Sequence, residues 1–280
     1  MSGVVGPRLS TILPLDLPGI TDDLLGAWSL RKLNTTYVGD CCIIYSGSSG
    51  QYSSSIGFTN EGYIDTQSIL DFVGPGGGAK VGTWYDQSGN GNDFTNGSYA
   101  NMLSIISGGN FFTKGDFIYL NEGGRQQLTA GFTQINVGES RTVFSVHHHN
   151  LSNTNRVWSL YRNAGVVVQY LSSNSNREII LYDRLSSPPL ISGSAQFDLG
   201  AFNLTTAIMQ ASPNETAVYY KGSKVFSSTN RVLDYSFKFQ TPDTTNSVDN
   251  SDAVEYFLYS GSKSDIREEL ETNINRYYGL

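Results

Sequence analysis

The stretch TWYDQSGNGND, Thr83–Asp93, is the most distinctive part of the 280-residue chain. Two aromatic residues end a predicted strand, and the eight residues from Asp86 to Asp93 are two glycines and six residues with side-chain oxygens. Asp and Asn bond to their own backbone and Gly adopts positive φ, so the segment can form a tight corner. The same oxygens suit Ca²⁺, and an aromatic ring suits a sugar. A metal loop, a sugar-binding loop, a catalytic loop and a structural corner are all open.

The composition indicates an all-β protein. The chain holds 30 Gly and 17 Tyr, with 15% charged and 12% aromatic residues. Such sequences form aromatic and β-branched strands between Gly, Ser and Asn turns. A net charge of −7 without any run of Lys or Arg argues against a nucleic-acid partner. No run of 18 apolar residues predicts a membrane span, and the first 23 residues do not resemble a signal peptide, so synthesis in a cytoplasm is expected.

Short β-branched and aromatic runs follow one another from Phe111 onward, bounded by Gly, Asn, Ser or Pro. This spacing predicts a sandwich or barrel. The clearest hairpin has a Lys-Gly-Ser turn at residues 221–223. Residues 1–25 lack periodicity and are predicted to be an attachment arm, which leaves residues 26–280 as one domain.

Two helices are expected. One short helix near residues 65–73 has Asp65 and Thr66 placed to cap it and Gly74 placed to end it. The other is a C-terminal amphipathic helix that Ser264 can cap and Gly279 can stop. Its apolar stripe must lie on the sheet or its rim, and comprises Ile266, Leu270, Ile274 and Tyr277 or Tyr278.

Three segments resemble, in order and spacing, the catalytic domain of family-54 α-L-arabinofuranosidases. They are AWSLRKLNTTYVG at 27–39, IGFTNEGYIDTQSILDFVG at 56–74 and the opening stretch. The C-terminal segment 254–279 resembles the last strand and closing helix of concanavalin A-like lectin/glucanase domains. The resemblance implies a concanavalin A-like jelly-roll β-sandwich.

Domains with the same YDQSGNGND block also recur in tailed-bacteriophage structural proteins, and the leader MSGVVGPRL is similar to the N-termini of marine phage fibre proteins. This resemblance implies a virion surface protein, either a tail fibre or a capsid-decoration module, made in the host cytoplasm. Its lectin-like domain would bind glycans or a host receptor. The arm would dock on other virion proteins, and the chain would form a homo-oligomer. The alternatives are an arabinofuranosidase-like glycoside hydrolase and a cement protein without a ligand.

Hydrolysis is the weaker expectation. A retaining glycosidase needs two carboxylates about 5 Å apart. The family's acid/base Asp lies in a Gly/Asn-rich loop before the last strand, where Asp243 and Asp249 are nearest, but the flanking Gly-Gly-Asp-Asn pattern is missing. Glu178 lies in a strand whose context differs from that of the family's nucleophile, and Cys41-Cys42 does not correspond to the family's mid-domain cysteine pair. Further candidate carboxylates are Asp86, Asp93, Asp183, Asp252 and Glu255.

The predicted ligand-binding residues all belong to the opening stretch. Strand alternation lets only one of its two aromatic side chains face a given cleft. Asp86 and Asp93 are the candidate calcium ligands, and no other cofactor is expected. The full predicted set is Trp84, Tyr85, Asp86, Asn90, Asn92 and Asp93.

Four further interpretations concern residues outside that stretch. His147 and His149 share a strand face, which is compatible with a two-histidine metal site, but solvent-facing histidines are the preferred interpretation because no carboxylate or cysteine stands beside them. Cys41 and Cys42 are predicted to be free thiols. Arg31 is predicted to be a buried partner of a loop carboxylate. The Tyr-rich strands are interpreted as core first and as glycan platforms second.

Overall fold

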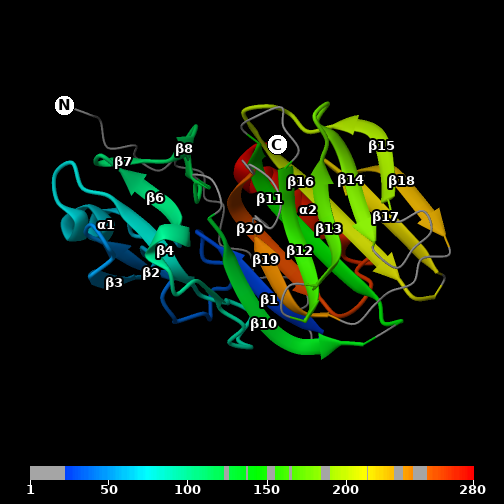
Figure 1. The fold of residues 1–280 in the computed structure, drawn as a ribbon, viewed down its shortest axis with the longest axis horizontal. Coiled ribbons are helices and arrows are strands. Elements are labelled where there is room, and N and C mark those ends of the chain that lie inside the picture. The colour runs from blue at the N-terminus through cyan, green and yellow to red at the C-terminus, as the bar shows by residue number, and fades with distance from the viewer. Residues whose placement is uncertain are drawn as a thin grey trace.

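The computed structural model describes residues 23–122, 126–136, 138–149, 155–163, 166–183, 190–212, 214–229, 236–241 and 251–280. Two antiparallel sheets face each other across a hydrophobic core, and the C-terminal helix lies behind one of them (Figure 1). The predicted all-β sandwich is confirmed. Neither helix in the described ranges has the length and apolar character that a bilayer crossing needs.

The smaller sheet has six strands and joins the two ends of the described chain, because the first strand pairs with the last. Strand β1 begins at Leu24, two residues before the predicted domain boundary. The remainder of the predicted arm, residues 1–22, lies outside the described residues. The strand order is β1 (Leu24–Ser29), β20 (Ser251–Tyr259), β11 (Arg141–His149), β16 (Ala201–Gln210), β17 (Glu215–Tyr220) and β18 (Ser223–Thr229).

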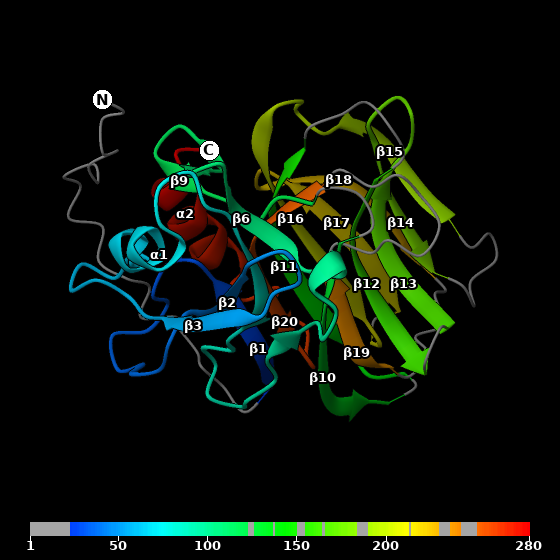
Figure 2. The same cartoon turned by 60° about the vertical axis from the view of Figure 1, so that its left-hand side comes forward.

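The larger sheet runs from one end of the molecule to the other. In Figure 2, β2, β3 and β6 lie with helix α1 on one side and β12–β15 on the opposite side. Its order is β15 (Leu190–Gln196), β14 (Glu178–Asp183), β13 (Val166–Ser173), β12 (Asn155–Asn163), β19 (Ser236–Thr241), β10 (Leu128–Ile135), β5 (Phe94–Thr95), β4 (Ala79–Trp84), β2 (Cys42–Ser46) and β3 (Tyr52–Ile56). Smaller elements complete the fold: β6 (Leu103–Ser107), β7 (Asn110–Phe111), β8 (Thr113–Lys114), β9 (Phe117–Ile118) and the 3₁₀ turn η1 (Tyr99–Asn101).

Both predicted helices are present. Helix α1 spans Thr66–Val73, and the Asp65 carboxylate caps it by accepting a hydrogen bond from Ser68 N at 3.1 Å. Helix α2 spans Arg267–Tyr278 and ends at Gly279, which has a left-handed φ of 69°. Ser264 does not cap α2 as predicted, because the helix begins only after Ile266 and no side chain caps it. Three members of the predicted stripe are buried, namely Leu270, Ile274 and Tyr278.

The predicted hairpin is confirmed, with a turn one residue shorter than expected. Only Lys221 and Gly222 separate the paired ends Tyr220 and Ser223. Both turn residues have positive φ, 48° and 81°. Positive φ at both central positions is the type I′ geometry, which matches the twist of the flanking strands.

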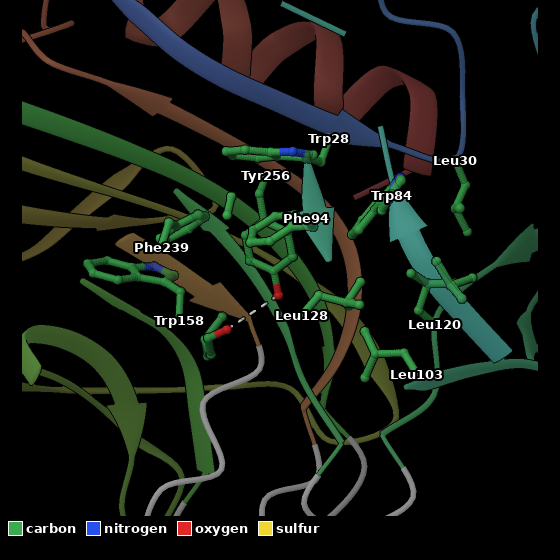
Figure 3. Close-up of a cluster of buried hydrophobic side chains, with 14 of the residues drawn as sticks. Trp28, Leu30, Trp84, Phe94, Leu103, Leu120, Leu128, Trp158, Phe239 and Tyr256 are labelled. Atoms are coloured by element: carbon green, nitrogen blue, oxygen red, sulfur yellow. Dashed lines mark hydrogen bonds between the residues drawn. The ribbon is translucent and has the colours of Figure 1, made fainter. Parts of the chain in front are cut away.

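The main core fills the space between the sheets and is rich in aromatic rings (Figure 3). Trp28 from the smaller sheet lies 4.2 Å from Phe94 of the larger sheet, centroid to centroid. A second cluster lies on the other face of the smaller sheet, where Leu270 and Ile274 of α2 pack with Phe257. The central strands of the smaller sheet are therefore buried on both faces.

Candidate functional site

The loop Asp86–Asp93 forms a corner built around one buried carboxylate. Asp86 is 4% exposed. Its two oxygens accept hydrogen bonds from the backbone N–H groups of Ala27, Ser88 and Asn92 and from the Ser88 hydroxyl, at 2.7–3.1 Å. Hydrogen bonds from backbone N–H groups to a carboxylate are stronger than hydrogen bonds between neutral groups. Asp86 therefore fixes the loop against β1.

The other predicted ligand residues in this loop also form hydrogen bonds within the protein, the two asparagines through their amide nitrogens. The side-chain amides of Asn90 and Asn92 donate to the Leu24 and Leu25 carbonyls, each at 2.5 Å. Asp93 accepts a hydrogen bond from the backbone N–H of Asp86 at 2.9 Å, and burial raises the pKa of its carboxyl. Within the described ranges no group of three or more His, Cys, Asp and Glu side chains is placed to hold a metal. The calcium site stays a prediction. The hydrogen bonds of this loop match the structural corner that the sequence also allowed.

Strand alternation separates the two aromatic residues that begin the loop. Trp84 is fully buried, and its indole N–H donates to the Ser29 carbonyl at 3.1 Å. It therefore has no surface to offer to a sugar, and the platform prediction is wrong for this residue. Tyr85 is half-buried, so it is the member of the pair that keeps contact with solvent.

Glu178 lies at the junction of β14 and the turn that precedes it. It starts β14, and its carboxylate accepts a hydrogen bond from the Asn174 side-chain amide at 2.5 Å. Its own N–H donates to the Asn174 side-chain oxygen at 3.0 Å, which closes the turn between β13 and β14. The other two catalytic candidates, Asp243 and Asp249, lie outside the described residues, as does the side chain of Asp183.

Two candidate carboxylates on β20 are fully buried and bonded. Asp252 accepts hydrogen bonds from the Asn121 side chain and the Glu122 N–H, each at 2.9 Å, and lies 3.0 Å from His148 Nδ1. Glu255 pairs with Arg31 at 2.8 Å. The buried carboxylate partner predicted for Arg31 is thus present, but it lies on a strand rather than in a loop. Neither carboxylate is exposed to a substrate.

The three histidines of β11 are buried, so the prediction of solvent-facing rings is wrong. The hydrophobic faces of the smaller sheet explain this result. His147 and His149 point between the sheets and pack against Phe197, at centroid distances of 4.6 and 5.2 Å. His148 points to the other face and stacks on Tyr119 at 4.6 Å. Burial lowers the pKa of His147 well below 6.5 and that of His149 to about 4.

Cys41 and Cys42 are free thiols, as predicted, and both are fully buried. Burial raises the pKa of the Cys41 thiol well above its usual value. A protonated, buried thiol is a poor nucleophile, so the structure gives Cys41 a packing role.

A different group of side chains forms an aromatic cluster on the larger sheet. Tyr170 on β13 and Tyr182 on β14 are directly opposite each other in the strand register, and their rings stack at 4.8 Å with an interplanar angle of 17°. The Arg156 guanidinium on β12 lies 4.2 Å from the centre of the Tyr170 ring. We call these three residues the tyrosine platform. All three are half-buried, whereas their neighbours Leu171 and Leu181 are fully buried core residues.

The strand register extends the platform across the sheet as a polar row. Tyr170 is opposite Ser159 on β12, and Ser159 is opposite Gln240 on β19. Ser159 and Gln240 are both buried, so within this row the two tyrosine rings are the partly exposed groups.

Sequence reasoning named the Tyr-rich strands only as second-choice platforms. A signal was present, because Tyr170 and Tyr182 are each next to a leucine in sequence and neighbouring residues of a strand point to opposite faces. Alternation alone turns such tyrosines away from the core. The cross-strand register that brings them together is long-range information.

No family model matches the sequence, and no curated protein matches it. Solved structures do. A GH54 α-L-arabinofuranosidase soaked with a cyclic sulfate inhibitor, and a variant of a GH54 enzyme soaked with 4-nitrophenyl α-L-arabinofuranoside, each align with a TM-score of 0.71 at 16% identity. An arabinofuranosidase complexed with arabinofuranosyl-α-1,2-xylobiose aligns with a TM-score of 0.70 at 15% identity. Each alignment covers 91% of this chain and 63% of the other. The chain thus spans under two thirds of those proteins, and what it shares with them is the β-sandwich fold.

Proposed function

We propose that this chain is a carbohydrate-binding virion surface protein of a tailed bacteriophage, a tail fibre or capsid-decoration module that contacts host or environmental glycans. The observation that carries the binding activity is the tyrosine platform, with its rings stacked at 4.8 Å and flanked by Arg156. Two structural neighbours were solved with an arabinofuranoside and a third with a cyclic sulfate inhibitor, and their shared β-sandwich fold supports this choice.

The chemistry of the platform suits a sugar. Pyranose and furanose rings have an apolar C–H face that packs on an aromatic ring, and their hydroxyls need nearby donors and acceptors. The guanidinium of Arg156 supplies donors beside Tyr170. The two tyrosine hydroxyls can act as donor or acceptor. Because Tyr170 and Tyr182 stand on paired strands, their separation is set by the sheet and little ordering is needed on binding.

The virion context rests on the YDQSGNGND block and on the leader that resembles phage fibre proteins. The arm, which comprises residues 1–22 because β1 begins at Leu24, would dock on another virion protein. A net charge of −7 suits an exposed and soluble coat, and oligomerisation would multiply weak glycan contacts. Deleting residues 1–22 and measuring incorporation into particles tests the docking role, because unchanged incorporation contradicts it.

An arabinofuranosidase-like hydrolase is the second candidate, favoured by the enzymes among the structural neighbours. Against it, the candidate carboxylates that the structure describes are bonded within the protein: Asp86, Asp93, Glu178, Asp252 and Glu255.

A glycan array and a turnover assay together separate the two functions. The full chain is applied to an array that includes arabinosylated and acidic glycans, and is incubated in parallel with 4-nitrophenyl α-L-arabinofuranoside. Glycan binding without nitrophenol release is the expected result. Steady release of nitrophenol above the buffer rate contradicts the binding-module proposal and favours the hydrolase.

A further inference from the structure

A groove lies on the larger sheet, far from the tyrosine platform. It has a volume of about 390 Å³, which is within the usual size of small-ligand pockets. Strands β4 and β6, which contribute to its walls, lie with α1 on the side of the molecule opposite β13 and β14 (Figures 1 and 2). The lining residues are Ser46, Gly47, Gly77, Gly78, Ala79, Lys80, Tyr99, Ser104, Ile106 and Ser107.

Lys80 is the cation of this groove. Its strand neighbours Ala79 and Val81 are buried, so alternation turns the half-buried Lys80 side chain to the outer face of the sheet. Its ammonium donates to the Ala100 carbonyl at 3.2 Å and lies 5.2 Å from the centre of the Tyr99 ring. No Asp or Glu is among the residues that line the groove.

Among the residues that line the groove, no carboxylate balances the charge of the Lys80 ammonium. Asp and Glu outnumber Lys and Arg, 25 against 18, and three described lysines have a carboxylate partner: Lys221 with Asp198, Lys224 with Glu215 and Lys263 with Asp23. Lys80 instead has a carbonyl and a ring face, and burial lowers the pKa of its ammonium. An anionic ligand would supply the missing charge, with a charge-assisted hydrogen bond.

The rest of the groove is neutral and fixed in shape. Tyr99 packs directly on Gly50, where an added Cβ would come within 2.6 Å of the ring, and the φ of 73° at Gly50 also favours glycine. The hydroxyl groups come from Ser46, Ser104 and Ser107. The Ser46 hydroxyl donates to Gly78 O at 2.9 Å and so ties the glycine-rich wall to β2.

We propose that this groove binds a sugar ring that carries a carboxylate, of the uronic or sialic acid class. The carboxylate pairs with Lys80, the apolar face of the ring packs on Tyr99, and the hydroxyls bond to Ser104 and Ser107. A single cation suits a monoanion better than a phosphate, which proteins usually hold with several donors or cations. The proposal is separate from the tyrosine platform, so the chain would have two glycan subsites of different charge.

Ligand-observed NMR on the full chain tests this site with D-glucuronate as the probe. Glucose and acetate are the two part-ligands, because one has the ring and the other has the carboxylate. The variants are Lys80→Gln and, as a matched control, Lys224→Gln, which removes an equal charge from an exposed hairpin lysine. Melting temperatures of all variants establish that each is folded.

Saturable glucuronate binding is expected to weaken at least fivefold in Lys80→Gln and in raised salt, and to stay unchanged in Lys224→Gln. Glucose and acetate are expected to bind at least fivefold more weakly than glucuronate. Absence of saturable binding overturns the proposal. So does equal binding by Lys80→Gln, or equal binding of acetate. Tyr182→Ala is expected to leave glucuronate binding at this groove unchanged, so the two glycan sites fail or succeed separately.

Discussion

Arg31 and Glu255 form a buried two-pronged ion pair, with Nε to Oε2 and Nη2 to Oε1 both at 2.8 Å. Arg31 is 2% exposed and Glu255 is 0% exposed. The Tyr278 hydroxyl donates to the same carboxylate at 3.1 Å, and the Tyr277 ring lies 4.1 Å from the guanidinium. The pair therefore joins the segment after β1, strand β20 and helix α2 at one point.

Replacing Glu255 with Gln is expected to destabilise the fold strongly. The change leaves the Arg31 guanidinium charged and unpaired in a buried site, and breaking a buried pair costs about 3–5 kcal/mol. Urea unfolding measures the free-energy change. The matched control is Glu215→Gln, whose partner Lys224 is exposed, and its expected cost is below about 1 kcal/mol. A similar small cost for Glu255→Gln is the result that refutes the structural role.

Replacing Asp86 with Asn is expected to weaken the hydrogen bonds that hold the loop Asp86–Asp93 against β1. An amide cannot accept from all four donors that now point at the carboxylate, so buried N–H groups lose their partners. The expected loss is about 2–4 kcal/mol of unfolding free energy. Asp71→Asn, on the exposed side of α1, is the control and should change stability by less than about 0.5 kcal/mol. Equal effects of the two variants contradict the account.

Acid is expected to destabilise the fold partly through His147. The native ring is buried with a pKa well below 6.5, whereas the unfolded chain protonates its histidines near the ordinary value of about 6.5. The unfolded state therefore binds more protons below that pH, and stability falls as the pH falls. One such group contributes about 1.4 kcal/mol per pH unit.

The variant His147→Leu isolates that contribution. Its unfolding free energy should fall less steeply than that of the unchanged chain between pH 6.5 and pH 5, a window chosen above the ordinary carboxylate range. Chemical denaturation at several pH values gives both slopes. Parallel slopes mean that His147 is not the group responsible.

Local sequence patterns predicted the elements whose formation depends on near neighbours. Strand β11 lies among the short runs predicted after Phe111, and Asp65 caps α1 through Ser68, three residues away. Two of the strands that were not predicted, β10 and β15, contain glycine and small polar residues in LTAGFTQI and LISGSAQ. Their strand character comes from pairing with neighbours in the sheet, which no local propensity encodes.

The candidate site was harder to predict because it depends on which sheet face is covered. In the oxygen-rich segment Asp86–Asp93, the side chains of Asp86 and Asn92 form hydrogen bonds to β1, and the histidines of β11 face apolar layers on both sides of the smaller sheet. Neither fact follows from spacing. Tyr170 and Tyr182 lie twelve residues apart in sequence, and only the register of β13 with β14 places their rings in contact.

The central claim is that the tyrosine platform binds glycans. It is tested most directly by comparing the glycan affinities of the variants Tyr182→Ala and Tyr52→Ala. Both remove a partly or largely exposed tyrosine, but Tyr52 stands on β3, away from the platform, with 63% of its surface exposed. With an array glycan whose binding Lys80→Gln leaves unchanged, Tyr182→Ala should bind at least tenfold more weakly, a change of about 1.4 kcal/mol, while Tyr52→Ala binds as the unchanged chain does. Undiminished binding by a folded Tyr182→Ala protein would contradict the account.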